Sequence, residues 1–187
     1  MLNKKGFTLI ELLVILAIIG ILSSMATVGL NGARIKAKRT KAYSDISEIR
    51  KAIDIFANDT SLWPGYQEDD QINSDAGNEL CGPDENANNC LNSLFSDFGG
   101  LSSDDGTYFG WSGPYIKIST LDPWGHEYFF DTDYQIDANG DPCACTGIAC
   151  SDAVVVGSYG PDGLGVPSGA TPGSYGCDDV IIVMLKN

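Results

Sequence analysis

The sequence predicts an α+β fold in which one long N-terminal helix packs on a small antiparallel β-sheet. Three observations lead to this prediction: an apolar run before residue 31, an apolar stripe at helical spacing after it, and short β-branched or aromatic segments in the last third. A chain of 187 residues has room for one membrane helix and one modest globular domain.

The helix is expected to run from about residue 7 to about residue 59. No charged side chain occurs from Leu12 to Leu30, and roughly 20 helical residues span the hydrocarbon core of a bilayer. The second half is amphipathic because four apolar residues recur at steps of three or four and should face a sheet. These residues are Ile46, Ile49, Ile53 and Phe56. The helix should stop before Trp63-Pro64-Gly65.

Short segments bounded by Gly, Pro and Asp predict strands near residues 128–130, 153–158 and 180–185, where β-branched or aromatic side chains gather. Residues 66–106 are acidic and rich in Asn, Ser and Gly, which indicates a long connecting loop. An apolar patch at residues 91–95 fits one helical turn within that loop.

Glu11 is the one carboxylate inside the apolar run. Burying an isolated charge in hydrocarbon costs several kcal/mol, so this side chain needs a partner. A free α-amino group is the most economical one, and a cut after Gly6 would create it. The alternatives are a Glu near the membrane interface that reaches for water, and an ordinary secretory signal peptide cleaved after Ala26.

Charge is divided sharply along the chain. Nine of the 11 Lys and Arg residues lie in residues 1–51, whereas 22 of the 25 Asp and Glu residues lie in residues 52–187. Such an acidic surface does not bind nucleic acid. It can attract cations, calcium among them, and most of its carboxylates are expected to be simply solvated.

All six cysteines follow the apolar run, and an even number suits disulfides outside the cytoplasm. The local pair would close an Asn- and Asp-rich loop between Cys81 and Cys90. A zinc site is the alternative for three of the others, although the usual Cys-x-x-Cys spacing is absent. The remaining cysteines are Cys143, Cys145, Cys150 and Cys177.

The stretch Lys4-Lys5-Gly6-Phe7-Thr8-Leu9-Ile10-Glu11-Leu12-Leu13 resembles the leader and mature N-terminus of type IV pilins and type II secretion pseudopilins. The resemblance implies that a prepilin peptidase cuts between Gly6 and Phe7 and methylates the new amine of Phe7. It also implies that Glu11 pairs with that amine in a neighbouring subunit. The expected parts are a leader (1–6), a transmembrane and assembly half of the helix (7–30), an amphipathic half (31–60) and a pilin-like head (61–187).

A second set of motifs resembles the major pseudopilin of type II secretion more than a generic pilin. The motifs are Gly110-Trp111-Ser112-Gly113-Pro114-Tyr115, Asp122-Pro123-Trp124-Gly125, Ser158-Tyr159-Gly160-Pro161-Asp162-Gly163 and Cys177-Asp178-Asp179. In that family the last two motifs form a calcium site.

The resemblance implies that Asp162 and Asp178 supply carboxylates to that site, with Asp179 as the alternative to its neighbour. Calcium takes six to eight oxygens, and Gly-rich loops expose backbone carbonyls. Here the carbonyls would come from Tyr159, Leu164 and Gly176. Ordinary Asp-Gly turns are the alternative, and residues 164–177 are longer than the family's loop. A second cation candidate, over residues 131–141, vaguely resembles an EF-hand loop.

The resemblance further implies a single-pass protein of a bacterial inner membrane, with its head outside the cytoplasm, that polymerises with identical subunits. Its expected partners are the prepilin peptidase, minor pseudopilins and an inner-membrane assembly platform. A surface type IV pilin for adhesion, motility or DNA uptake is the alternative, as is an anchored binding module that never polymerises.

Catalytic motifs are absent from the sequence. His126 is the only histidine, and there is no His-Glu-x-x-His, Gly-x-Ser-x-Gly or phosphate-binding loop. We therefore expect no enzymatic activity and assign His126 to a turn.

Overall fold

The computed structural model describes residues 8–67, 80–81, 93–140, 151–163 and 178–186, and of residues 24–29, 133 and 186 it describes the backbone alone. The chain divides into two compact units, residues 1–38 and residues 39–187. The expected leader (1–6) and much of the expected loop (66–106) fall outside the described residues.

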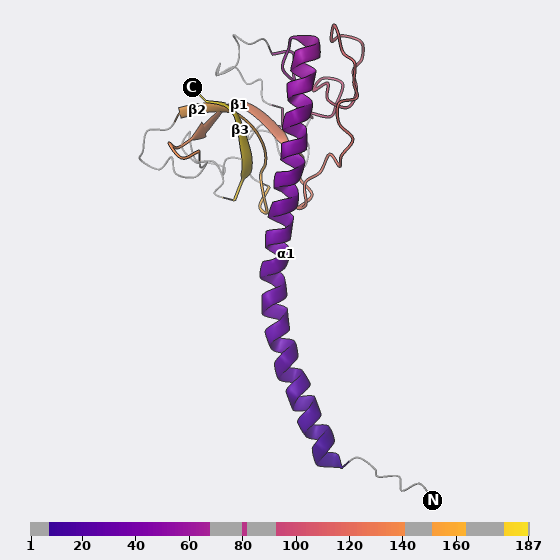
Figure 1. Cartoon of the computed structure of the whole chain (residues 1–187), viewed down its shortest axis with the longest axis vertical. Helices are drawn as coiled ribbons and strands as arrows, with labels where there is room; N and C mark the ends of the chain where they lie inside the picture. The colour runs from indigo at the N-terminus through magenta and orange to yellow at the C-terminus, as the bar shows by residue number, and fades with distance from the viewer. Residues whose placement is uncertain (1–7, 68–79, 82–92, 141–150, 164–177, 187) are drawn as a thin grey trace, which may run out of the picture. The chain divides into compact units, whose positions relative to one another are not determined.

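Helix α1 (Leu9–Thr60) has 52 residues, and its ends lie within two residues of the predicted ones (Figure 1). At the C-terminal end the Thr60 hydroxyl donates to the Phe56 carbonyl at 2.8 Å. Ser61 follows with φ +58°, the left-handed conformation that commonly ends a helix. The predicted stop before Trp63 is therefore confirmed.

The sheet consists of β1 (Phe129–Ile136), β2 (Ser151–Ser158) and β3 (Val180–Lys186), antiparallel and in chain order (Figure 1). All three strands lie where short β-branched and aromatic segments predicted them. β1 is longer than predicted because it continues through polar residues that are buried, Asp131 and Thr132, with a register shift before Tyr134.

The length of β1 corrects the EF-hand-like interpretation of residues 131–141. Residues 131–136 are strand rather than loop. The next acidic residue, Asp137, closes a turn by accepting the backbone N–H of Asn139 at 2.8 Å and its side-chain amide at 3.0 Å. Both oxygens of that carboxylate are therefore used within the turn.

The predicted stripe of α1 forms the centre of the core. Ile46, Ile49, Ile53 and Phe56 are all fully buried. They belong to one cluster with alternate residues of the sheet, because successive side chains of a strand point to opposite faces. The strand residues in that cluster include Phe130, Val154 and Val156, and Tyr128, which precedes β1, belongs to it as well. Fully burying one such side chain is worth about 1.5–3 kcal/mol, so this face fixes the helix on the sheet.

A second, smaller cluster includes strand residues whose side chains point to the opposite face of the sheet. It contains Cys81, Phe129, Tyr134, Ile136, Ala153, Val155 and Tyr159. The rings of Phe129 and Tyr159 stack with centroids 4.2 Å apart. The sheet therefore buries side chains on both of its faces, although α1 contributes residues to only one of the two clusters.

Residues 93–116 complete the first cluster from the connecting segment. Leu94 and Phe95, from the predicted apolar patch, are buried there together with Leu101. Tyr108 stacks on Tyr66 with centroids 4.1 Å apart and donates its hydroxyl to the Phe98 carbonyl at 2.6 Å. Burial raises the pKa of the Tyr108 hydroxyl, which thus stays protonated and able to donate.

Within the residues that the structure describes, no helix is both long enough and apolar enough to cross a membrane.

Candidate functional site

The N-terminus of α1 carries a reciprocal hydrogen-bonded cap. The Glu11 carboxylate accepts the backbone N–H of Thr8 at 2.9 Å and its hydroxyl at 2.8 Å, while the Thr8 hydroxyl oxygen accepts the Glu11 N–H at 3.3 Å. This is a capping box, in which Thr and Glu three residues apart satisfy orphan donors of the first turn. The Thr-x-x-Glu spacing that signals it is present in the sequence, although the predicted partner of Glu11 was an amine.

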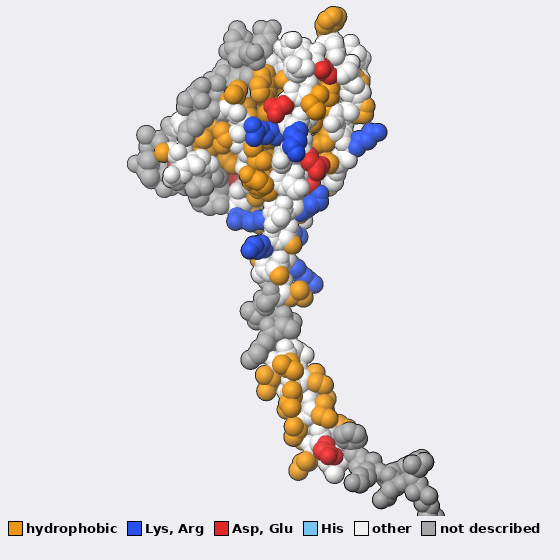
Figure 2. Space-filling model, viewed as in Figure 1, with side chains coloured by type: hydrophobic (Ala, Val, Ile, Leu, Met, Phe, Trp, Pro, Cys, Tyr) orange, Lys and Arg blue, Asp and Glu red, His pale blue; other side chains and the backbone are white. Residues whose placement is uncertain are grey.

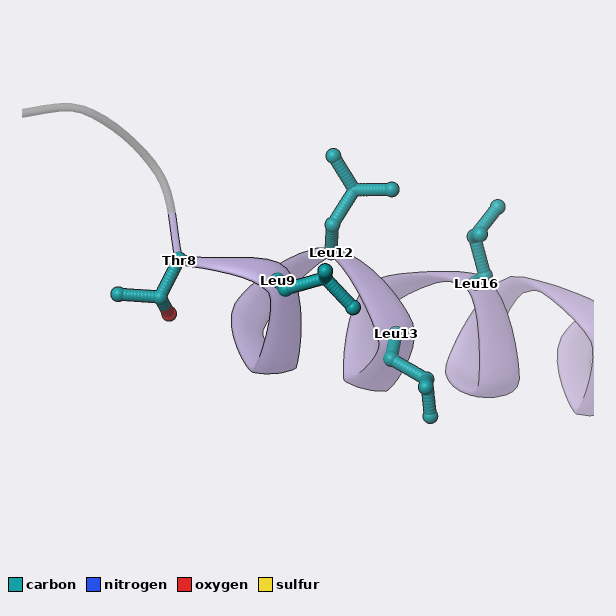
Figure 3. A pocket seen from close by; sticks show the side chains of 5 residues that line it. All are labelled: Thr8, Leu9, Leu12, Leu13 and Leu16. Carbon is teal, nitrogen blue, oxygen red and sulfur yellow. The ribbon is translucent and has the colours of Figure 1, made fainter.

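The first turns of α1 expose apolar side chains. Leu9 is 84% exposed and Leu16 61% exposed, and Figure 2 shows hydrophobic side chains gathered along this part of the helix. Thr8 and four leucines line a hollow of about 390 Å³ (Figure 3). The leucines are Leu9, Leu12, Leu13 and Leu16. Soluble monomers rarely leave large contiguous apolar patches uncovered, so this surface indicates a binding function.

The expected processing residues Gly6 and Phe7 lie outside the described residues. The cleavage between them and the pairing of Glu11 with a Phe7 amine therefore stay predictions. What the structure adds is that Glu11 already has a partner, Thr8, within its own chain.

The loop that follows β2 brings two of the predicted calcium ligands together. The backbone N–H of Asp162 donates to Asp178 Oδ2 at 3.3 Å, although these residues are 16 apart in sequence. Gly160 lies against the same residue: its φ is +65°, and a Cβ there would be 2.4 Å from the Asp178 carbonyl oxygen. Glycine is therefore required at position 160 both for its backbone conformation and for this close approach.

Asp179, the alternative ligand, faces a different part of the molecule. Its Oδ2 accepts the Tyr134 hydroxyl at 2.7 Å, and the residue is buried. Since Tyr134 belongs to the second cluster, the structure separates two adjacent acids that the sequence left equivalent.

The remaining predicted ligands are only partly described. Tyr159 is buried and its hydroxyl donates to the Cys81 carbonyl at 2.9 Å, whereas Leu164 and Gly176 lie outside the described residues. Among the described residues, no three His, Cys, Asp or Glu side chains gather as a metal site would require. The donor set of Asp162 and Asp178 fits calcium in its chemistry, because carboxylate oxygens are ligands that this ion prefers.

The turn at residues 122–126 contacts the end of β2 and the loop that follows it. Asp122 Oδ1 accepts three backbone N–H groups at 2.8–2.9 Å, those of Trp124, Gly125 and His126. Its Oδ2 accepts the hydroxyl of Ser158, at the end of β2. Because the Asp122 side chain is fully buried, this network is shielded from competing water.

His126 lies in that turn, as predicted, and its ring also contacts the loop. Nδ1 is 3.0 Å from the Gly160 carbonyl oxygen and 3.9 Å from Asp122 Oδ2. The sequence predicts the turn but not the contact, which joins residues 34 apart.

Cys81 takes part in a disulfide. Its partner is one of five cysteines, Cys90, Cys143, Cys145, Cys150 and Cys177, all of which lie outside the described residues. The pairing of Cys81 with Cys90 and the alternative zinc site therefore stay predictions.

The N-terminus of the chain matches a known sequence motif. Residues 1–27 match the family model of the prokaryotic N-terminal methylation motif. No solved structure matches the chain.

Three similar proteins share one name, type II secretion system core protein G. The protein of Pectobacterium carotovorum is 37% identical over 66 residues, which cover 35% of this chain and 42% of that protein. The Vibrio cholerae protein is 29% identical over 177 residues and 95% of both chains. The Klebsiella pneumoniae protein is 27% identical over 162 residues, or 87% of this chain and 88% of its own. The match to the first of these relatives thus spans less than half of its length, whereas the other two match along most of theirs.

Proposed function

Since this chain is a type IV pilin-like protein with a prepilin-type N-terminus and resembles type II secretion system core protein G, we propose that it is a structural subunit of a type II secretion pseudopilus. The observation that carries the proposal is the N-terminal segment. A methylation motif leads directly into a helix whose leucines are exposed and whose one carboxylate, Glu11, lies at its first turn.

In the proposed assembly, the exposed leucines pack against the same segment of neighbouring copies. Removal of residues 1–6 by a prepilin peptidase creates an amine on Phe7, and Glu11 exchanges its Thr8 contact for the amine of the next subunit. Breaking one partner of a buried ion pair costs about 3–5 kcal/mol, so the pair would fix the register of the subunits. The role is structural, and no catalytic step is assigned to the chain.

The proposed location before assembly is a bacterial inner membrane, with the acidic head outside the cytoplasm. A disulfide at Cys81 supports a head that matures in an oxidising compartment. Minor pseudopilins and an inner-membrane assembly platform are the proposed further partners, because a chain without a motor must receive its energy from elsewhere.

The test compares the intact mass, N-terminal sequence and fibre formation of wild type, Glu11→Ala and a matched control, Glu48→Ala. Glu48 is an exposed glutamate on the same helix. We expect all three to begin at methylated Phe7, and only Glu11→Ala to fail in forming fibres. A mature chain that begins at Thr27 would instead identify a secreted domain and overturn the proposal.

We also propose that the loop carrying Asp162 and Asp178 binds calcium. What supports this is the approach of the two residues and the glycine that lets their backbones meet. A ligand that binds only the folded state at one hundred times its Kd stabilises it by about 2.7 kcal/mol. Calcium should therefore raise the Tm of wild type, and a chelator should reverse the shift.

Asp162→Ala and Asp178→Ala should each abolish the calcium-dependent shift in Tm, while Asp152→Ala should keep it. Asp152 is an exposed aspartate of β2 and serves as the control. A wild-type Tm that does not respond to calcium would refute the site without affecting the assembly proposal.

A further inference from the structure

We propose that His126 is a positioning residue: it holds Gly160 through its carbonyl and so presets the loop that carries Asp162 for a divalent cation. The inference rests on the proposed calcium function of that loop. It goes beyond that function because it assigns a role to a residue outside the expected ligand set.

Gly160 is held at both of its backbone polar groups. Its N–H donates to Ser158 Oγ at 3.1 Å, and the hydroxyl of that serine in turn donates to Asp122. Its carbonyl oxygen lies 3.0 Å from His126 Nδ1. A carbonyl can only accept, so Nδ1 carries the proton in this contact. The two contacts lead back to one turn, residues 122–126.

The ring of His126 also lies against Gly163. Gly163 has φ +66°, and a Cβ at that position would be 2.4 Å from His126 Nε2. The side chain of His126 is 14% exposed, so the ring is packed rather than free to rotate. The imidazole therefore contacts both Gly160 and Gly163, the residues that flank Pro161 and Asp162.

Holding both ends of a four-residue segment limits the positions that Asp162 can take. The Asp162 N–H donates to Asp178 Oδ2. Restraining the backbone of Asp162 therefore also positions the carboxylate of Asp178. A loop that is ordered before the ion arrives loses less conformational entropy on binding. The hydrogen bond from Nδ1, rather than a charge on the ring, is the feature that this role requires.

Two substitutions separate the hydrogen bond from the bulk of the ring. His126→Asn keeps a donor near the position of Nδ1, whereas His126→Leu fills similar space without a donor. The first measurement is amide hydrogen exchange of the full chain in detergent with a chelator present. We expect exchange of the peptide covering residues 159–163 to rise at least tenfold in His126→Leu and to stay within about threefold of wild type in His126→Asn.

The second measurement is calcium affinity by titration calorimetry on the same three proteins. We expect His126→Leu to bind about tenfold more weakly and His126→Asn to stay within about threefold of wild type. A merely structural residue would lower Tm in both variants without this split in affinity.

The outcomes are distinct. Unchanged exchange in His126→Leu overturns the hold on Gly160, whether or not calcium binds. Faster exchange with wild-type calcium affinity overturns the positioning role alone. If wild type, Asp162→Ala and Asp178→Ala all fail to bind calcium, the proposed cation site fails, and with it the positioning role, while the exchange data still decide whether His126 holds Gly160.

Discussion

The two ends of α1 differ in the exposure of their apolar side chains. Near the N-terminus Leu9 and Leu13 are 84% and 60% exposed, whereas Ile49 and Phe56 near the C-terminus are fully buried. Burial of apolar area is the main source of folding free energy. The C-terminal part therefore stabilises the head, and the N-terminal part leaves its apolar area exposed. One helix thus combines a folding surface with the surface proposed for assembly.

The largest expected effect that tests this comparison comes from truncating a buried residue. Phe56→Ala should destabilise the head by about 3–5 kcal/mol, because it removes a fully buried ring. Its neighbour Ile55 is 53% exposed, so Ile55→Ala should change the free energy of unfolding by less than about 0.5 kcal/mol. Denaturant titration of the full chain in detergent measures both.

Leu13→Ala extends the same experiment to the other end of the helix. It should leave the unfolding of the head unchanged and weaken fibre formation instead. Equal loss of head stability in Leu13→Ala and Phe56→Ala would show that the two surfaces do not have separate roles.

A smaller effect is expected from the polar contact within the buried part of the helix. Asp45 is 5% exposed; its Oδ2 accepts the Tyr128 hydroxyl at 2.9 Å, and its other oxygen pairs with Lys41. Burial, together with the hydrogen bond to Asp45, raises the pKa of Tyr128 and keeps its proton in place. Asp45→Ala leaves that hydroxyl without its acceptor and should cost about 1–3 kcal/mol.

A double-mutant cycle with Tyr128→Phe measures this contact directly. We expect a coupling of about 0.5–3 kcal/mol, since the two side chains touch. Asp54→Ala, at an exposed position of the same helix, is the control and should be close to neutral. Additive effects of the Asp45 and Tyr128 substitutions would mean that the hydrogen bond adds nothing to stability.

The smallest effect is expected at the exposed end. Thr8→Val removes the hydroxyl of the capping box and should weaken the first turn of α1 by about 0.5–2 kcal/mol, whereas Thr8→Ser should retain the cap. Hydrogen exchange of residues 9–13 reports on this, while the Tm of the head should not move. A shift in head Tm would contradict the separation of the two surfaces.

Sequence patterns predicted those features that depend on residues close together in the chain. The ends of α1, its buried stripe and the three strands follow from local periodicity and turn residues, and all were found near their expected places. The continuation of β1 beyond residue 130 was not predicted, because Asp131 and Thr132 lack the apolar character by which strands are recognised.

Contacts between distant residues were not predictable in the same way. Asp45 with Tyr128 and His126 with Gly160 join residues 83 and 34 apart, and no local pattern pairs them. The different surroundings of Asp178 and Asp179 were also not predictable, because only the folded chain brings Tyr134 to one of them. The capping box of Thr8 and Glu11 is different, since its Thr-x-x-Glu spacing is local and could have predicted it.

The sequence separations within the core have a consequence for the order of folding. The stripe of α1 packs with β2 and, through Val180 and Ile182, with β3, so its partners are made about a hundred residues after it. Chains dominated by such distant contacts fold slowly, because loop closure must precede the contacts that reward it. During synthesis the whole of α1 is thus made before the sheet that covers part of it. A cell that produces this protein must keep the apolar stripe of α1 from aggregating until β3 is complete.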